Sequence, residues 1–441
     1  MNTVNSKENI INTLKIMIML TVSILGMIQL VDSFDSFNSV NIYKKDFIQE
    51  YMLAKAVLSG TNPYLQLSTL GELIFGQLPV TIFQHPTPHP PPVAVLMLPL
   101  GILTYNMAAI VWFIFELFCI VIIACYILLI INKRLTVIEV LVASLAILAW
   151  NPVIVEIVLG QLMLFILALL VCAWQKLHNK QELSGGLLLG LAISFKLIVW
   201  PILVYLTLCK RWKAVIAAFT TVVLANFMAI FIMGWSSVIT YYLETGPKVA
   251  SLYHSFVSNF SLWSLSWKAL EGTGSKVLVG VTAPPLIQSS EFAGYLACVL
   301  PLIVLVFGMT SARRSADFDI SFGILLCVSI LIAPIAWNHY LILTLIPMVI
   351  IGKYYIKRKL ASEYNILYMF IVAALLVPQS TINAIIDILM SIKEVSVTNS
   401  KIAFLIAQIG MFPALVVVGI LLLLHKVGNT SIVSSCNGKM T

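Results

Sequence analysis

Long apolar stretches dominate the chain and are separated by short polar segments. The stretches lie at about 11–31, 107–131, 135–150, 153–175, 184–208, 214–233, 291–309, 319–336, 339–352, 362–383 and 401–424. Many have the length of about 20 residues that a helix needs to cross a bilayer, whereas a membrane β-barrel would show alternating segments of about ten. The pattern predicts an all-α polytopic membrane protein with roughly 10–12 transmembrane helices. No polar linker divides it, so we expect one membrane domain over residues 1–441.

The composition supports this class and adds an orientation. Of the 441 residues, 60% are hydrophobic and 10% are charged, which is too few charges for a soluble enzyme, a disordered chain or a nucleic-acid-binding domain. Part of the net charge of +8 comes from short loops that contain Lys176, Lys180, Lys210, Arg211, Arg313 and Arg314. The positive-inside rule places these loops and both termini in the cytoplasm. The loops at about 32–92, 234–290 and 384–400 then lie outside a cell membrane that the chain crosses many times.

Two apolar segments are too short to be ordinary spans. The stretch between Lys180 and Lys210 cannot cross the bilayer out and back, so we expect two half-helices that meet near Lys196. The segment from Val93 to Leu103 is predicted to be a re-entrant or outer-leaflet helix. Broken helices at membrane depth are tolerated where they line protein or water, so they often mark binding sites.

The first outside loop supplies a candidate catalytic carboxylate. Residues 43–58 have helical apolar spacing, which predicts an amphipathic helix at the membrane surface outside the bilayer core. Asp46 lies near its start, at the boundary between membrane and water. The alternative is that Asp46 merely stabilises the N-terminus of this helix.

Other polar residues fall at positions that face the same outer side. Lys196 is a cation inside an apolar stretch, which is costly and usually functional, and an anion is its natural ligand. His339 follows the helix-breaking Pro334, and Trp337 suits a membrane interface. Gln161 lies near the outer end of its helix. His339 and Gln161 also have structural alternatives, as a donor to a carbonyl and as an interhelical hydrogen-bonding residue.

Two motifs have simpler explanations than catalysis or metal binding. Asp317 and Asp319 form a D-x-D match, but it sits in a short basic loop without a nucleotide-binding fold. His85 and His89 are separated by prolines and lack a third ligand nearby, which favours a stiff loop over a metal site. We therefore expect no metal and no cofactor.

The order and spacing of many positions resemble glycosyltransferase family 87. The matching positions are Asp46-Phe47, Tyr51, Ala54, Leu58, Gly60, Asn62-Pro63-Tyr64, Pro91-Pro92-Val93, Leu98-Pro99-Leu100, Ala108, Ala109, Trp112, Gly160-Gln161, Gly185-Gly186, Gly190-Leu191, Lys196, Pro201, Lys210-Arg211-Trp212, Pro334, Trp337 and His339. The resemblance covers about residues 40–345. In the second outside loop, many members read Asn-Gln-Ser where this chain has Asn259-Phe260-Ser261.

The resemblance implies a GT-C-type bundle with re-entrant half-helices and an outside juxtamembrane helix. It also implies a polyprenyl-phosphate sugar as donor, usually mannose and in some members arabinofuranose, and a glycolipid or glycan as acceptor. Asp46 corresponds to the catalytic carboxylate, and His339 to a histidine of the cavity. We expect the substrate cavity to include Gln161, Asn259, Trp337, Tyr51 and Asn62.

The proposed chemistry is a single displacement in which Asp46 takes the proton of the acceptor hydroxyl. Lys196 and His339 would hold the donor phosphate as it leaves. Membrane lipids surround the protein, and no nucleic acid is involved. The sequence leaves two alternatives open, a secondary transporter or lipid flippase and a membrane polysaccharide polymerase or ligase.

Overall fold

The computed structural model of the chain is built from helices. It describes residues 2–131, 135–274, 281–358, 362–392 and 400–437. Within these ranges no strand is present, and one antiparallel bridge joins Thr273 and Ala283. The all-α expectation is therefore confirmed.

Five helical stretches are long and apolar enough to cross a bilayer by themselves. They lie in α1 (Asn2–Ser33), α5 (Tyr105–Ile130), α11 (Trp212–Met233), α15 (Ser290–Arg314) and the pair α21–α22 (Ser400–Ala407 and Phe412–Asn437). Two further pairs are apolar enough but bent, by 80° between α6 (Val137–Leu148) and α7 (Asn151–Leu159), and by 81° between α18 (Ser362–Leu375) and α19 (Gln379–Ser391). The described chain thus has five to seven candidate spans.

Shorter helices take up the remaining apolar stretches. They are α4 (Pro91–Gly101), α8 (Met163–His178), α9 (Glu182–Phe195), α10 (Trp200–Leu208), α16 (Phe318–Leu331) and α17 (Leu345–Arg358). At 1.5 Å per residue each is about 24 Å long or less, below the 30 Å of a typical hydrocarbon core. Helix α16 is buried at every position from Asp319 to Leu331, which places it in the centre of the bundle.

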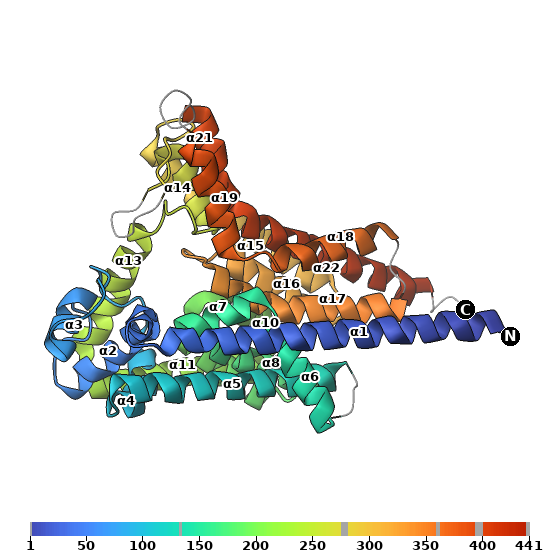
Figure 1. Cartoon of the computed structure of the whole chain (residues 1–441), viewed down its shortest axis with the longest axis horizontal. Helices are drawn as coiled ribbons and strands as arrows, with labels where there is room; N and C mark the ends of the chain where they lie inside the picture. The colour runs from blue at the N-terminus through green and yellow to red at the C-terminus, as the bar shows by residue number, and fades with distance from the viewer. Residues whose placement is uncertain (1, 132–134, 275–280, 359–361, 393–399, 438–441) are drawn as a thin grey trace.

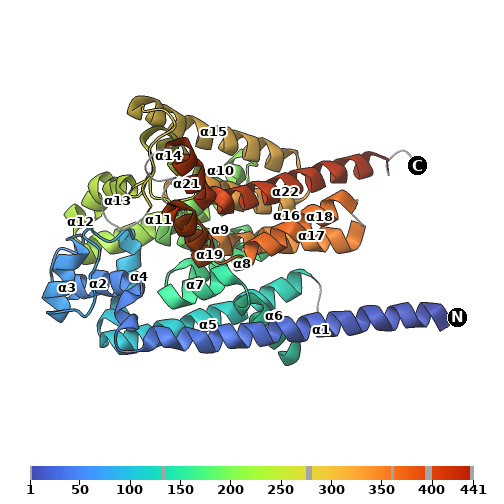
Figure 2. The ribbon, with the colours of Figure 1, turned by 45° about the horizontal axis from the view of Figure 1, so that its top comes forward.

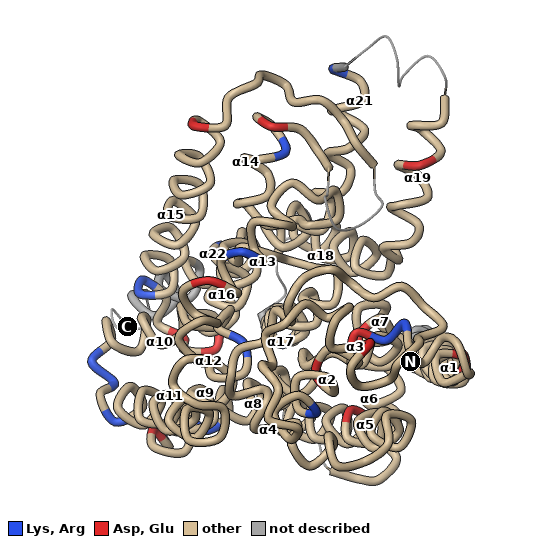
Figure 3. Tube along the Cα trace, turned by 90° about the vertical axis from the view of Figure 1, so that its left-hand side faces the viewer, with Lys and Arg blue, Asp and Glu red and all other residues tan. Residues whose placement is uncertain are grey.

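The long helices run side by side between two ends of the molecule. Helix α1 begins and α22 ends at the same end (Figures 1 and 2). The opposite end carries α2 (Phe47–Leu58), α3 (Leu67–Phe75), α4, α12 (Trp235–Thr240) and α13 (Gly246–Leu252). Helices α14 (Leu262–Glu271), α19 and α21 form an arm beside them (Figure 1). Charged residues are sparse along the tube when the molecule is viewed from the α2–α4 end (Figure 3).

Helices α9 and α10 form the expected hairpin with its tip at Lys196. The backbone of Lys196 is extended, with φ of −155°, and separates α9 from the short 3-10 turn Leu197–Val199 that leads into α10. At the open end, Arg211 Nε donates to Glu182 Oε1 over 2.9 Å, so the end of α10 returns to the start of α9. Neither arm is long enough to cross the bilayer by itself.

Glycines allow α11 to pack closely along α9. A Cβ atom at Gly186 would lie 2.3 Å from the carbonyl oxygen of Ala214, and one at Gly190 would lie 2.5 Å from that of Ala218. This spacing of small residues four apart is the usual way for membrane helices to bring their backbones together. The contact fixes the direction of α9 and thereby the position of Lys196.

The helix expected at residues 43–58 differs from the expectation in its start and its burial. It begins at Phe47, with Asp46 at the N-cap, and nine of its twelve residues are buried. Helix α2 is therefore not an amphipathic helix with one face in water, because α3, α4 and α5 pack around it. The apolar spacing indicated the helix correctly but could not show that its polar face is covered as well.

The stretch 153–175, expected as one helix, is broken in the middle. Helix α7 ends at Gly160, whose φ of 69° is left-handed, and α8 begins at Met163. A Cβ atom at Gly160 would lie 2.9 Å from Cβ of Phe47. Glycine is thus required both by the backbone conformation and by the close approach of α2. The break places Gln161 beside the start of α2.

Candidate active site

Asp46 is the centre of a polar cluster at the α2–α4 end of the molecule. Its side chain is half-buried, and Oδ2 accepts a hydrogen bond of 2.9 Å from Gln161 Nε2, while Oδ1 accepts one of 3.4 Å from Gln49. Burial raises the pKa of Asp46 to about 6, with a further rise from the charge of Glu50, although the hydrogen bond from Gln161 opposes the shift. A carboxyl group with this pKa is suited to exchanging protons near neutral pH.

Gln161 is held by the break between α7 and α8. It is 6% exposed and follows Gly160 directly, so the left-handed turn aims its amide at the carboxylate of Asp46. Two residues 115 positions apart in the sequence are thereby joined. The sequence suggested both residues as candidates, and the structure brings them into contact.

Lys45 links the start of α2 to the end of α7 by hydrogen bonds. Its Nζ donates to the carbonyl oxygens of Ile157, at 3.1 Å, and Val158, at 2.8 Å. These carbonyls belong to the last turn of α7, where a cation is favourable. Burial lowers the pKa of Lys45 to about 8, against the opposing charge of Glu116. Asp46 is thus flanked by a lysine that docks on α7 and by a helix that begins at Phe47.

Glu50 and His89 lie close together one turn along α2 from Asp46. Glu50 is 0% exposed, and its Oε1 is 2.9 Å from Nε2 of His89. Both residues act electrostatically on Asp46, where Glu50 raises its pKa and His89 lowers it. The two histidines of the proline-rich loop have separate partners, because His85 Nε2 lies 2.6 Å from the hydroxyl of Tyr253.

Lys196 presents its ammonium group at the tip of the α9–α10 hairpin. It is half-buried, and Nζ lies 4.2 Å from the centre of the Tyr340 ring, a cation–π contact. No carboxylate of the described residues forms an ion pair with it. Glu156 lies near enough to interact electrostatically, but its Oε1 accepts the backbone N–H groups of Met163 and Leu164 at the start of α8.

His339 lies in the 3-10 turn η5 (Asn338–Thr344) beside Lys196. The ring is 4% exposed and packs edge-on against Tyr340, with ring centres 4.9 Å apart. Its Nε2 is buried without a hydrogen-bond partner in the described structure. The charges of Lys196 and His89 both act on it. An unpaired buried nitrogen beside an unpaired lysine is an arrangement that an anionic group would complete.

The side-chain amide of Asn259 is fully used in backbone contacts. Nδ2 donates to the carbonyl oxygens of Tyr253 and Pro334, at 3.1 and 3.3 Å, and Oδ1 accepts from Ser261 and Ala336, at 3.1 and 3.0 Å. The side chain joins the segment from Tyr253 to Ser261 to the break before η5. It therefore positions the segment that carries His339.

The remaining candidates lie outside the immediate cluster. Trp337 is half-buried and packs against Tyr253 and Phe256, with ring centres 5.4 and 5.7 Å apart. The hydroxyl of Tyr51 donates to the carbonyl oxygen of Leu103 at 2.9 Å, towards the turn between α4 and α5. The exposed Asn62 accepts from the backbone N–H of Tyr64 at 2.9 Å and forms a local turn. The assignment of Tyr51 and Asn62 to the substrate cavity stays a prediction.

Sequence reasoning missed the buried acids. Glu116 and Glu156 lie inside apolar stretches and are buried, as is Glu50 on α2. The rule that singled out Lys196, that an ionisable residue inside the membrane is functional by default, applies equally to Glu116 and Glu156. The partnership of Glu50 with His89 left no signal in the sequence, because it depends on how the proline-rich loop folds over α2.

The D-x-D motif lies at the opposite end of α16 from His339. Asp319 accepts hydrogen bonds from Trp174 Nε1 at 2.9 Å and Lys353 Nζ at 3.1 Å, and it lies 2.6 Å from Nδ1 of His178. Asp317 caps the N-terminus of α16. These contacts join α8, α16 and α17. Among the described residues no group of three His, Cys, Asp or Glu side chains is placed to hold a metal ion.

A comparison with protein families decides the class of reaction. The model of glycosyltransferase family 87 matches residues 88–334, which is more than half of the chain. The chain belongs to glycosyltransferase family 87. The matched range contains Gln161, Lys196 and Asn259, whereas Asp46 and His339 lie outside it. No curated protein and no solved structure matches the chain.

This membership, together with the apolar helices, makes the protein a multi-pass membrane glycosyltransferase. It favours the enzyme over the transporter or flippase that the sequence left open. A family 87 enzyme moves a sugar from a donor to an acceptor, and the polar cluster around Asp46 is the candidate place for that transfer.

Proposed function

We propose that the enzyme transfers a hexose, mannose in the first instance, from a polyprenyl-phosphate donor to a hydroxyl group of a glycolipid or glycan acceptor. The transfer would take place on the outer face of the cell membrane, with both termini in the cytoplasm. The membership of family 87 and the position of the polar cluster, at the end opposite the start of α1 and the end of α22, support this proposal.

In the proposed step, Asp46 acts as the general base. The acceptor oxygen attacks the anomeric carbon of the sugar, and its proton passes to a carboxylate oxygen of Asp46. The new C–O bond forms as the bond between the sugar and the phosphate oxygen breaks. Gln161 orients the carboxylate through the hydrogen bond of 2.9 Å. A positioned base of this kind contributes a factor of about 10² to 10⁴ to the rate.

The polyprenyl phosphate leaves with the electron pair of the broken bond. Lys196 and His339 meet the negative charge that grows on its oxygen. Lys196 has no ion-pair partner and Nε2 of His339 has no hydrogen-bond partner among the described residues, so the phosphate need not displace an ion pair of the lysine or a hydrogen bond of this nitrogen. Preorganised donors in a poorly hydrated site stabilise such charge more than water does.

The observation that carries the proposal is the contact between Asp46 and Gln161. It joins the residue before α2 to the matched family region, at the break between α7 and α8. A carboxylate placed merely to favour the start of α2 would not need this partner, and no N-cap hydrogen bond from α2 to Asp46 is present.

The direct test is a transfer assay with the purified enzyme in lipid vesicles. Polyprenyl-phosphate [¹⁴C]mannose is supplied with a lipid extract as acceptor, and labelled product is separated from the donor. We expect label in an acceptor lipid or glycan, and none when the acceptor fraction is omitted. Transfer from a nucleotide sugar in place of the polyprenyl donor would refute the proposed donor class.

A further inference from the structure

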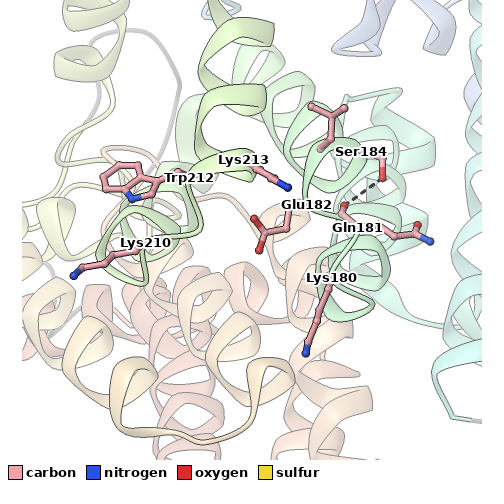
Figure 4. A pocket seen from close by; sticks show the side chains of 8 residues that line it. Lys180, Gln181, Glu182, Ser184, Lys210, Trp212 and Lys213 are labelled. Carbon is pink, nitrogen blue, oxygen red and sulfur yellow. Dashed lines mark hydrogen bonds between the residues drawn. The ribbon is translucent and has the colours of Figure 1, made fainter.

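A cavity of ≈ 810 Å³ lies at the open end of the α9–α10 hairpin, whose tip carries Lys196. The lining residues are Lys180, Gln181, Glu182, Leu183, Ser184, Lys210, Trp212 and Lys213. They come from the starts of α9 and α11, and in Figure 4 the side chains of Lys180 and Lys210 extend from its two sides.

The electrostatics of this cavity favour an anion. Three lysines line it, and its carboxylate, Glu182, is neutralised by Arg211 through the ion pair of 2.9 Å. The N-termini of α9 and α11 both begin at the cavity, and neither N-cap residue, Gln181 or Arg211, makes a side-chain capping hydrogen bond. Two helix starts without a side-chain cap add positive dipole ends to the lysine charges.

The two sides of the cavity share a local structure that is unusual for lysine. Lys180 and Lys210 have positive φ angles, 59° and 57°. At each junction, the residue after the lysine caps the C-terminus of the helix before it. Gln181 N–H donates to the carbonyl oxygen of Lys176 in α8, and Arg211 N–H donates to that of Leu206 in α10. Glycine is the ordinary residue for this left-handed position. Lysine at both positions therefore carries a backbone cost that glycine would not.

Apolar side chains beside the cavity indicate a ligand with hydrocarbon tails. Leu183 and Leu187 on α9 are 64% and 43% exposed, and Trp212 and Ile216 on α11 are 53% and 64% exposed. They continue from the cavity along the outer surface of the two helices. A free phosphate would use the lysines but not this surface.

We infer that the cavity is a binding site for the phosphate head group of an anionic phospholipid, held by Lys180, Lys210 and Lys213, with its acyl chains on α9 and α11. The site is independent of the donor and acceptor sites. Basic pockets between membrane helices bind the head groups of acidic lipids in this way. A phospholipid bound there would stabilise the open end of the hairpin whose tip carries Lys196.

The test uses the full-length enzyme in nanodiscs and dioleoylphosphatidylglycerol as probe. Retained lipid is counted by native mass spectrometry in a background of phosphatidylcholine. Lys180→Asn with Lys210→Asn removes two charges while keeping residues that tolerate the left-handed backbone. Arg313→Gln with Arg314→Gln removes two exposed charges from the end of α15 and is the matched control.

We expect the Lys180→Asn, Lys210→Asn variant to bind phosphatidylglycerol about 30-fold more weakly. This factor corresponds to a loss of about 1 kcal/mol of binding free energy for each lysine removed. The control variant and a Lys180→Arg, Lys210→Arg variant should bind like the wild type. The Arg variant tests whether positive charge is sufficient, and a Tm of the Asn variant near that of the wild type separates loss of binding from loss of folding. Equal retention in both charge-removal variants would overturn the site. Displacement of the lipid by millimolar inorganic phosphate would overturn the assignment to a lipid.

Discussion

At the scale of single residues, the candidate site depends on a few side chains whose partners are far away in the sequence. Asp46 is held by Gln161, Lys45 by the end of α7, and Glu50 by His89. Removal of either member of the Glu50–His89 pair leaves a buried group without its partner. The pH dependence of the reaction is the property in which these contacts should be visible.

The first prediction concerns the acid side of the pH profile. The base must be deprotonated, so kcat/KM should rise with pH through the pKa of Asp46, about 6. Glu50→Gln removes a charge that raises this pKa, so the rise should move to lower pH. His89→Gln removes a charge that lowers it, so the rise should move to higher pH.

The measurement is kcat/KM between pH 4.5 and 8 for the wild type and both variants. Shifts in opposite directions support Asp46 as the titrating group. A profile that stays in place in both variants would show that another group controls the reaction.

The second prediction concerns Lys196. Lys196→Met keeps the apolar bulk and removes the charge, so we expect polyprenyl-phosphate binding to weaken by about 10- to 100-fold, the worth of a hydrogen bond to a charged group. Lys196→Arg should keep part of the affinity. Fluorescence titration with a labelled polyprenyl phosphate measures this directly, and unchanged affinity in the Met variant would make Lys196 a structural residue.

At the scale of elements, the sequence predicted much of the hairpin and little of its surroundings. The distance between Lys180 and Lys210 was enough to predict two half-helices, because helix length is set by a fixed rise per residue. The break at Gly160 was missed because apolar residues continue on both sides of it. Whether a glycine in an apolar stretch is left-handed depends on its neighbour, here Phe47, which the local pattern does not contain.

The third prediction concerns the contact between α9 and α11. Gly190→Leu would bring a side chain against the carbonyl oxygen of Ala218 and the Cβ of Thr221, which are 2.5 and 2.7 Å from an added Cβ. Overpacking of this kind costs about 1–3 kcal/mol or more. Thermal unfolding in detergent should show a lower Tm than in the wild type.

Leu187→Phe adds bulk to the same helix on an exposed position and is the control. It should leave the Tm near that of the wild type. If Gly190→Leu is as stable as the control, the close approach of the two helices is not needed for folding.

At the scale of the whole molecule, the protein is a bundle whose catalytic candidates gather at one end. The composition was sufficient to predict an all-α membrane protein, because apolar stretches of this length occur mainly as membrane-spanning helices. The burial of α2 on all sides was not predictable, since it depends on α3, α4 and α5 meeting around it.

The fourth prediction concerns orientation. If the loops 32–92 and 234–290 face away from the cytoplasm, cysteines introduced at the partly exposed Ser68 and the exposed Ser251 should react with an impermeant thiol reagent in intact cells. A cysteine at Arg314, exposed at the other end of the bundle, should react after lysis alone. Reaction of the first two only after lysis would invert the orientation and place the transfer in the cytoplasm.

The central claim is that Asp46 is the base of a glycosyl transfer, and single-turnover kinetics of Asp46→Asn tests it most directly. Asparagine keeps the size of the side chain and can still bond to Gln161, but it cannot take up the acceptor proton. With donor prebound and acceptor added in excess, we predict that the rate constant for transfer falls at least 100-fold, the lower end of general-base effects. Donor affinity should stay near that of the wild type. Transfer at a rate near that of the wild type would contradict the account.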